Sequence, residues 1–537
     1  MKLNVHRILR AGLPALLLTL AALPARAGDT LDVTLNGYYR LRGYFFNNLD
    51  LQKGDVKNSD GTVAQKDMRT NTSYTLNRMR LEPAIMINEN LGVFASMDVI
   101  DNVMGGHQAF SPAPLFAGYS SNHQKDLTVA DSIQVKRVWA EHKFKFGVLR
   151  FGRMPSNFGM GLFSNDGGNG VGLTKKTLAE KWASYFDEDF GDNDGGSTYD
   201  RILFATKPGG PESNLLVALY WDHLVEGNID REGDDVDEYG FVTYYNPKPE
   251  ENTGNVTRGG VYGIRRLMYK TKSEIYSVSG HFYMKAKPLY TEAELVLLFG
   301  ASKNAGIPFA KYLEAKFGDV MVSVARVGYD NDMMDARLEI GYSSGDPEAG
   351  NSSNGGSLYA DCNTPTGVDA NGQPTFKSSK CNMKTFNIHG DHNVGLIMFD
   401  QALAQNLGPS GFAAGGVINA LYVYPTFKYR LSGRNLEGLN LLAAVLWGRS
   451  MKAYQFRGVA DKPAGSPGNP TDRAVKGDNS TDLGIEVDLG LQYYFTENLR
   501  VDFQGGYLLP GDGYPVLIGG QSADPAYALI SKFTLVF

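Results

Sequence analysis

The chain has 537 residues, among them 63 Gly, 29 Tyr, 28 Phe and only two Cys, and its formal net charge at pH 7 is −6. A net acidic chain gives no reason to expect nucleic-acid binding, and the lack of any long uncharged apolar run excludes insertion as a membrane helix. Two soluble domains would be the default for this length. The many glycines and aromatic residues are instead typical of repeated membrane strands.

Residues 1–27 have the pattern of a secretory signal peptide. Three basic residues precede the apolar stretch Leu13–Leu23, and Ala25-Arg26-Ala27 is a small-x-small cleavage site. We therefore expect residues 28–537 to form the mature chain, as a single domain. Because the signal carries basic residues and no acidic ones, the mature chain is more acidic still.

The C-terminal stretch Tyr527–Phe537 alternates in polarity. Its apolar face carries Tyr527, Leu529, Phe533, Leu535 and Phe537, and its other face carries Ala528, Lys532 and Thr534. About ten alternating residues are what a tilted strand needs to cross a bilayer. A terminal Phe with alternate aromatics resembles the C-terminal signal of Gram-negative outer-membrane β-barrels, which implies that Phe537 is read by the barrel assembly machinery. The alternative is a closing strand of a soluble sandwich.

The same alternation recurs along the chain, interrupted by long polar loops and by short turns such as Glu89-Asn90. This order of long loop, strand, short turn and strand is typical of an up-and-down antiparallel barrel. We count seventeen to twenty crossings and, because single-chain bacterial barrels have even numbers, predict an all-β transmembrane barrel of 18 strands, with 16 as the alternative. Short turns would face the periplasm and long loops the exterior. Candidate strands are 31–45, 74–88, 91–98, 133–146, 148–153, 198–206, 214–225, 236–245, 260–271, 274–285, 289–299, 309–317, 320–329, 335–342, 395–399, 417–431, 439–449, 485–495, 499–507 and 527–537.

If the apolar faces meet lipid, charged side chains line the lumen. The basic set is Arg40, Arg42, Arg78, Arg80, Arg137, Arg150, Arg201, Arg337 and Arg500, and the acidic set includes Glu82, Glu141, Glu339, Glu486, Asp488 and Asp502. Cross-strand Arg–carboxylate pairs can brace a wall without any ligand, and for a single residue we favour that interpretation.

The predicted size of the barrel nevertheless favours a pore. A lumen of 16 to 18 strands is too wide for side chains to fill, so it holds water unless a segment plugs it. The long loop Pro155–Gly196 is the available constriction. Arginines clustered on the early strands would create a local positive field and a weak preference for anions.

The two cysteines, Cys362 and Cys381, lie in the polar stretch Gly345–Lys384. An exported chain meets an oxidising compartment, so we predict that they form one disulfide that staples a loop.

Two sets of motifs resemble known outer-membrane proteins. Gly484-Ile485-Glu486-Val487-Asp488, Tyr507-Leu508-Leu509-Pro510-Gly511-Asp512 and Gly341-Tyr342-Ser343-Ser344-Gly345-Asp346 resemble strand ends of alginate-export porins, which implies passage of an acidic polysaccharide. Leu149-Arg150-Phe151-Gly152-Arg153-Met154-Pro155-Ser156, Gly159-Met160-Gly161, Asn165-Asp166-Gly167 and Asp200-Arg201 resemble an uncharacterised group of proteobacterial outer-membrane barrel proteins. That second group implies the fold and no activity.

Enzymatic and metal sites are less well supported. His281, His389 and His392 are available bases, but no nucleophile motif of recognised spacing accompanies them. The cluster His389-Gly390-Asp391-His392 is better interpreted as a polar strand end. The acidic stretches Asp187–Asp194 and Asp230–Glu238 could bind Ca²⁺ or bridge lipopolysaccharide, yet neither has EF-hand spacing. We expect no enzyme, no cofactor and no metal.

The sequence therefore predicts a porin-like channel in the outer membrane of a Gram-negative bacterium. It would conduct hydrophilic solutes by passive diffusion or export an acidic polysaccharide. The alternative is a structural or adhesive outer-membrane protein with a plugged lumen and functional surface loops. The expected partners are outer-membrane lipids, lipopolysaccharide, the barrel assembly machinery and the transported solute or polymer.

Overall fold

A computed structural model describes residues 32–537 except 50, 52–55, 58–62, 66–70, 105–132, 168–188, 192–195, 226–234, 252, 270–271, 303–313, 346–364, 369–373, 377–379, 404–415, 432–437, 453–479 and 515–522. The expected signal peptide, Cys362 and most of the acidic stretch 187–194 lie outside the described residues.

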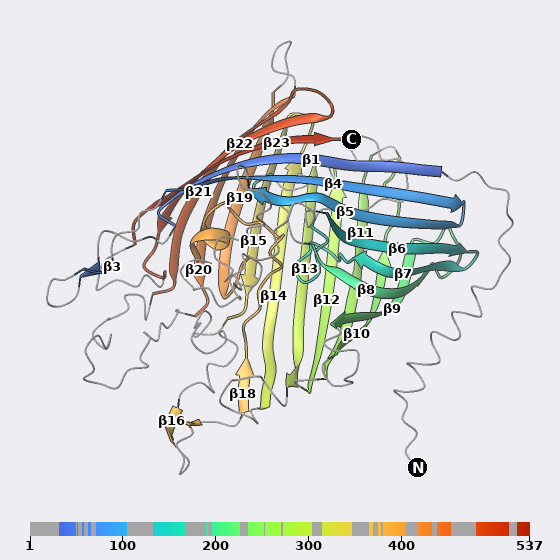
Figure 1. Cartoon of the computed structure of the whole chain (residues 1–537), viewed down its shortest axis with the longest axis horizontal. Coiled ribbons are helices and arrows are strands. Elements are labelled where there is room, and N and C mark those ends of the chain that lie inside the picture. The colour runs from blue at the N-terminus through green and yellow to red at the C-terminus, as the bar shows by residue number, and fades with distance from the viewer. Residues whose placement is uncertain are drawn as a thin grey trace.

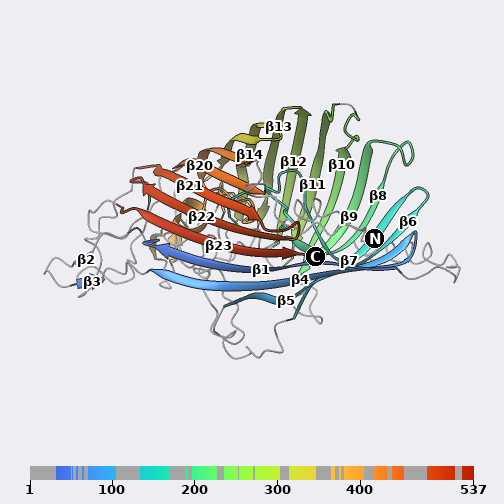
Figure 2. The same ribbon diagram turned by 90° about the horizontal axis from the view of Figure 1, so that it is seen from above.

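Eighteen antiparallel strands form a closed barrel (Figures 1 and 2). The ring closes because β1 pairs with β4 on one side and with the last strand, β23, on the other. The barrel strands are β1 (Asp32–Asn47), β4 (Thr72–Asn88), β5 (Leu91–Met104), β6 (Gln134–Phe144), β7 (Gly147–Pro155), β8 (Thr198–Thr206), β9 (Leu215–Val225), β10 (Val236–Tyr245), β11 (Val256–Met268), β12 (Ser273–Ala286), β13 (Leu289–Ser302), β14 (Glu314–Asp330), β15 (Met334–Ser343), β19 (Ala420–Arg430), β20 (Leu439–Ser450), β21 (Asp482–Tyr494), β22 (Leu499–Pro510) and β23 (Ala526–Val536).

Shorter elements lie in the long loops. A short strand, β18 (Lys380–Met383), runs parallel to β14, and a single π-helical turn, η4 (Met398–Leu403), follows it. Two small hairpins are formed by β2 (Val56–Lys57) with β3 (Val63–Gln65) and by β16 (Pro365–Val368) with β17 (Pro374–Phe376).

The predicted count of 18 strands is confirmed, and two of the twenty candidate strands are wrong. Residues 314–317 of candidate 309–317, the part that the structure describes, and candidate 320–329 belong to one strand, β14, whose pairing with β13 shifts register between Leu298 and Gly300. That irregularity absorbs the break in polarity that suggested two strands. Candidate 395–399 is no strand, because its apolar residues lie inside the barrel at the start of η4.

The outer face of the barrel is apolar, as predicted. Val33, Leu219 and Leu489 are about 60% exposed. Beside Leu219 in sequence, Ala218 and Tyr220 are buried, as is Asp488 beside Leu489. This alternation is the expected pattern when lipid surrounds a barrel with a polar interior. Within the described part of the chain, no helix is long and apolar enough to cross a membrane.

The two ends of the barrel differ. At one end two residues join β4 to β5, β6 to β7 and β12 to β13, and both Asp32 and Phe537 lie there. We call this the short-turn end. The other end carries the connections 156–197, 344–419 and 451–481, and we call it the long-loop end.

Candidate functional site

The inner face of the barrel carries the charged residues that the sequence placed in the lumen. Those buried there are Arg40, Arg42, Arg78, Arg80, Glu82, Arg137, Glu141, Arg201, Glu339, Glu486, Asp488, Arg500 and Asp502. Arg150 shares that face, because it lies opposite Glu141 and bonds it at 2.6 Å, but its side chain is 39% exposed. Arg337 is also inward, with its Nε 3.2 Å from Thr426 Oγ1.

Several of these arginines brace neighbouring strands. Arg80 donates two hydrogen bonds of 2.6 and 2.8 Å to Asp98, and Arg201 donates two of 2.6 and 2.7 Å to Asp222. All four side chains are buried. Such paired charges need no ligand to explain them. Asp98 and Asp222 were absent from the predicted set. Each lies on the inward face of the strand that follows its arginine, and this pattern in the sequence could have identified them.

Other cations gather on one side of the ring. The register places Arg40 of β1 opposite Arg78 of β4, and Arg42 of β1 opposite Lys532 of β23. We define the cationic wall as Arg500 of β22, Lys532, Arg40, Arg42, Arg78 and Arg80. In the middle of these four strands the inward acids are Asp502 and Glu82. Within this wall Arg80 pairs with Asp98 and Arg500 pairs with Asp502. Like charges that face each other across a ladder, as Arg40 and Arg78 do, are unfavourable.

The loop between β7 and β8 crosses the lumen. The backbone N–H of Met160 donates to Glu294 of β13 at 2.7 Å, and Phe158 stacks on Tyr262 of β11 at 5.2 Å. Further along the same loop, Gln504 of β22 donates to the carbonyl oxygen of Asp189 at 2.8 Å. Contacts with two well-separated parts of the ring show that the described part of this loop lies inside the barrel.

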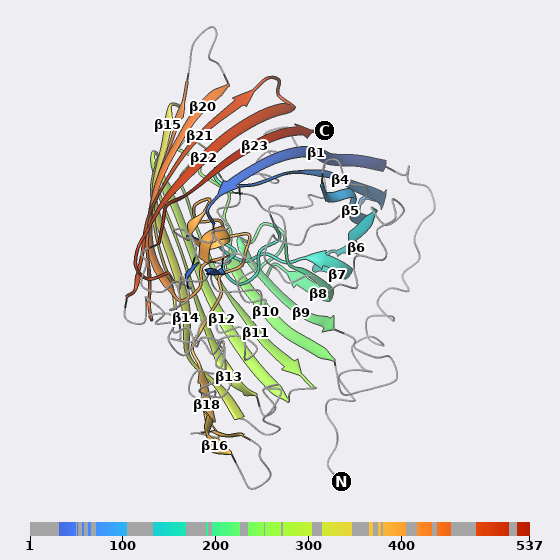
Figure 3. The same cartoon turned by 60° about the vertical axis from the view of Figure 1, so that its left-hand side comes forward.

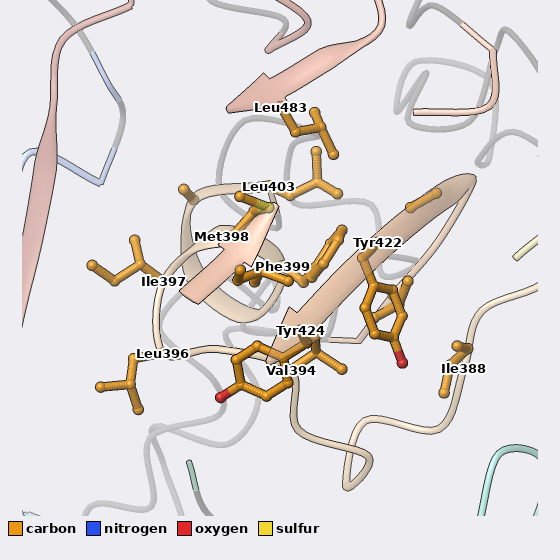
Figure 4. Packing of buried hydrophobic residues seen from close by; sticks show 14 of the residues in the cluster. Ile388, Val394, Leu396, Ile397, Met398, Phe399, Leu403, Tyr422, Tyr424 and Leu483 are labelled. Atoms are coloured by element: carbon orange, nitrogen blue, oxygen red, sulfur yellow. The ribbon is translucent and has the colours of Figure 1, made fainter. Parts of the chain in front are cut away.

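A second inner segment, residues 386–403, fills much of one side of the lumen. We call it the plug. It contains Ile388, Val394, Leu396, Ile397, Met398, Phe399, Ala402 and Leu403, each at most 3% exposed. Figure 4 shows these side chains, except that of Ala402, together with Tyr422 and Tyr424 of β19 and Leu483 of β21, and Figure 3 shows the turn within the ring of strands.

The plug is an obstruction of the lumen in addition to the loop Pro155–Gly196, the constriction that the sequence suggested. An apolar core inside the barrel explains why the inner faces of β14, β20 and β23 carry Val322, Leu446 and Ile530. The signal in the sequence was the stretch 441–447, which is apolar on both faces. A strand that is apolar on both faces is covered on both faces.

The two inner segments are joined to each other. Ser197 Oγ lies 3.1 Å from His389 Nε2, the Gly196 N–H donates to Asp391, and the His389 N–H donates to the Leu162 carbonyl oxygen at 2.9 Å. Burial lowers the pKa of His389, which favours the neutral ring.

This Ser–His–Asp grouping is a clasp and not a catalytic triad. The Asp391 backbone N–H donates to His389 Nδ1 at 3.2 Å, while the Asp391 carboxylate lies 3.6 Å from the same nitrogen. This geometry favours the tautomer that carries its proton on Nε2, facing Ser197. A triad requires the opposite tautomer, with Nε2 free to take the serine proton. Among the described residues no group of His, Cys, Asp or Glu is arranged to hold a metal ion.

Near the short-turn end the inner face is accessible. A cavity of about 620 Å³ is lined by Lys285, Lys287, Pro288, Asp330, Asn331, Asp332 and Arg430. Lys285 and Arg430 both pair with Asp330, at 3.0 and 3.4 Å. The sequence analysis did not identify these residues because they lie at strand ends. There the alternation of polar and apolar residues, which assigns each residue to a face, stops.

Asp189 lies between the inner loop and the wall. It bonds Lys428 of β19 at 2.8 Å. Burial alone would raise the pKa of Asp189, but the charges of Lys428 and Arg337 outweigh it and lower that pKa. The carboxylate therefore stays ionised between two cations.

Comparison with known proteins finds likeness in architecture alone. No family model matches the chain, and no curated protein matches it. Among solved structures, vanillate-bound OpdK of Pseudomonas aeruginosa is 10% identical, with a TM-score of 0.45 over 94% of this chain and 99% of that one. OccK9 (OpdG) of the same species is 11% identical, with a TM-score of 0.46 over 94% and 98%. A BenF-like porin from Pseudomonas fluorescens is 10% identical, with a TM-score of 0.44 over 94% and 99%.

At such identities a likeness concerns the fold, which the strand pairing already establishes. None of these comparisons connects the chain to alginate-export porins, so that resemblance is not confirmed.

Proposed function

We propose that the protein is an outer-membrane channel for small hydrophilic anions, with the short-turn end in the periplasm. The observation that carries this proposal is the cationic wall. Six cationic side chains occupy adjacent inner positions of β22, β23, β1 and β4 in a chain whose net charge is negative. A low-dielectric wall focuses such a field into the lumen and raises the local anion concentration.

The inner segments favour small solutes over a polymer. The β7–β8 loop and the plug both occupy the lumen and are clasped together at Ser197 and His389. An extended acidic polysaccharide would need an unobstructed conduit along the barrel axis. Export of such a polymer therefore remains the less favoured version of the proposal, and a conductance assay with added polyuronate tests it by current block.

A specific observation supports the second candidate function, that of a structural or adhesive protein with a closed lumen. The apolar core inside the barrel is the packing of a stable domain, as a structural or adhesive outer-membrane protein with a closed lumen would have. The two proposals differ in a single measurable property, which is ion conductance across a lipid bilayer.

Reversal potentials under a salt gradient test the anion proposal. We expect a weak anion preference that falls in the double variant Arg40→Gln/Arg78→Gln and disappears near molar salt, because screening acts over about 8 Å at physiological ionic strength. The matched control is Arg153→Gln/Arg265→Gln, which removes two exposed arginines that pair with Asp200 and Glu274.

Three results would contradict the proposal. Cation selectivity, or an unchanged reversal potential in the Arg40/Arg78 variant, would identify the cationic wall as structural. Absence of any conductance would favour the closed-lumen alternative.

A further inference from the structure

One buried carboxylate holds the turn of the plug. Glu486, on the inner face of β21, accepts backbone hydrogen bonds from Leu396 at 2.6 Å and Ile397 at 2.8 Å on Oε1, and from Met398 at 2.6 Å on Oε2. The side chain is fully buried. The neighbouring Gly395 has a φ of +75°, and a Cβ there would lie 2.8 Å from Leu446 and 3.0 Å from Glu486 Oε1. The backbone therefore approaches the carboxylate as closely as glycine permits.

The chemistry of this contact explains why a charged residue stands in an apolar core. The first N–H groups of a helical turn have no partner within the turn, and leaving them unpaired among apolar side chains is costly. A carboxylate can satisfy several donors at once, and charge-assisted bonds are short and strong. Aligned N–H groups at the start of a turn also favour a negative charge.

The attachment is specific to Glu486. Asp488 stands two residues along the same strand, on the same inner face, and is equally buried. No N–H group in the described residues donates to either of its carboxylate oxygens. These two neighbouring buried acids therefore differ in their hydrogen bonds to the plug.

We propose that Glu486 is the positioning residue of the plug and thereby sets the free cross-section of the lumen. This inference rests on the proposed channel function and adds a residue that determines which solutes pass. With Glu486 in place, the turn 396–403 stays against β20 and β21. Without its carboxylate, the turn detaches from that wall and the lumen widens.

The test compares two amide variants that preserve size. In Glu486→Gln the oxygen can still accept the two N–H groups now on Oε1, but its NH₂ group then faces the Met398 N–H, so donor meets donor. In Asp488→Asn no bond to the plug is lost and the side chain keeps its size. We expect a larger single-channel conductance and passage of larger solutes for Glu486→Gln, and wild-type values for Asp488→Asn.

Thiol labelling provides a readout that does not depend on conductance. Met398→Cys places a thiol at a fully buried position of the plug. We expect the peptide that contains position 398 to be labelled at least about tenfold faster in the Glu486→Gln background, since an orphaned buried N–H weakens local structure by about one power of ten or more. The Asp488→Asn background should label at the rate of Met398→Cys alone.

Folding of each variant is verified by heat-modifiable mobility on a gel. A folded Glu486→Gln protein with unchanged conductance and unchanged labelling would overturn the inference, as would equal effects of the two amide variants. If wild-type protein conducts nothing while labelling still separates the variants, the proposed function fails and the anchoring role of Glu486 stands. If Glu486→Gln does not fold, Glu486→Asp, which shortens the side chain by one methylene, is tested in the same way.

Discussion

The backbones of Gly37 and Phe537 exchange two hydrogen bonds of 3.0 Å, and the Phe537 ring covers Gly37 so closely that a Cβ there would lie 2.8 Å from it. These two residues complete the seam between β1 and β23, so the last residue of the chain helps to close the barrel. An aromatic ring that covers a strand glycine is a known device for pinning register.

Deletion of Phe537 is therefore expected to impair closure of the barrel as well as removing the predicted assembly signal. We expect less protein in the outer membrane and more in the periplasm, measured by fractionation and by heat-modifiable mobility. The matched control is Phe503→Ala, which removes a 52% exposed ring from the outer face of β22. Normal assembly of the deletion variant would contradict both roles of Phe537.

The buried pair Arg201–Asp222 should matter more to stability than the exposed pair Arg153–Asp200. In Asp222→Ala a buried guanidinium loses its partner, which typically costs about 3–5 kcal/mol. Asp200→Ala breaks a pair whose side chains are about half exposed, and such pairs contribute about 0–1 kcal/mol. Urea unfolding midpoints of the two variants test this order, and equal midpoints would contradict it.

Much of the fold could be predicted from the sequence because the lipid imposes a strict rule. An outer face that meets lipid must be apolar, so alternation along β4 or β22 indicates which side chains point inward, and Arg78 and Arg500 are buried. The same rule failed for residues 395–399. Their apolar character is that of a strand, but it reflects burial inside the lumen.

The contacts within the lumen could not be predicted from the sequence, for a physical reason. Alternation gives the side on which a residue lies and carries no information about its partner across the ring. Alternation places Glu486 on the inward face of its strand, yet nothing local to it shows that residues 396–398 return to it. Contacts between the chain's inner segments, such as Ser197 with His389, likewise depend on how two distant loops fold.

The clasp at Ser197 leads to a chemical prediction. In the tautomer that the Asp391 N–H favours, His389 Nε2 carries a proton and cannot act as a general base for Ser197, so we expect no reaction with a fluorophosphonate probe. Mass spectrometry of the peptide that contains Ser197 measures this. A covalent adduct on Ser197 that is lost in His389→Ala would show that the protein is a hydrolase.

Cys362 and Cys381 are predicted to form a disulfide in the long loop between β15 and β19. Closing a loop of this size stabilises a chain by roughly 3 kcal/mol in the chain-entropy model. We expect neither thiol to react with maleimide on intact cells until a reductant is added. Labelling without reductant would show that the cysteines are free.

The last prediction concerns pH and Asp400, in the π-helical turn of the plug. Burial raises the pKa of Asp400 to about 7. The hydrogen bond that Asp400 accepts from the Gly416 N–H lowers the pKa, and the nearby charge of Glu486 raises it. His392 lowers the pKa and Asp391 raises it. The unfolded chain has an ordinary aspartate pKa of about 3.9.

The folded state therefore binds the Asp400 proton more tightly than the unfolded state does. The stability that this difference contributes is complete below about pH 4 and is lost as the pH rises through about 7. At one pKa unit per 1.36 kcal/mol, the loss amounts to roughly 4 kcal/mol at most. Asp400→Asn carries no titrating group there, so its stability should exceed that of the wild type above pH 7 and match it near pH 4.

Urea unfolding midpoints of the wild type and Asp400→Asn at pH 4, 6 and 8 measure this difference. Glu497→Gln, in the exposed turn between β21 and β22, serves as the control for removing one carboxylate. We expect the gap between wild type and Asp400→Asn to widen with pH and to stop growing above about 8, because the carboxylate is then ionised in both folded and unfolded chains. A constant gap, or one that narrows as the pH rises, would show that Asp400 is not held protonated by its burial in the plug.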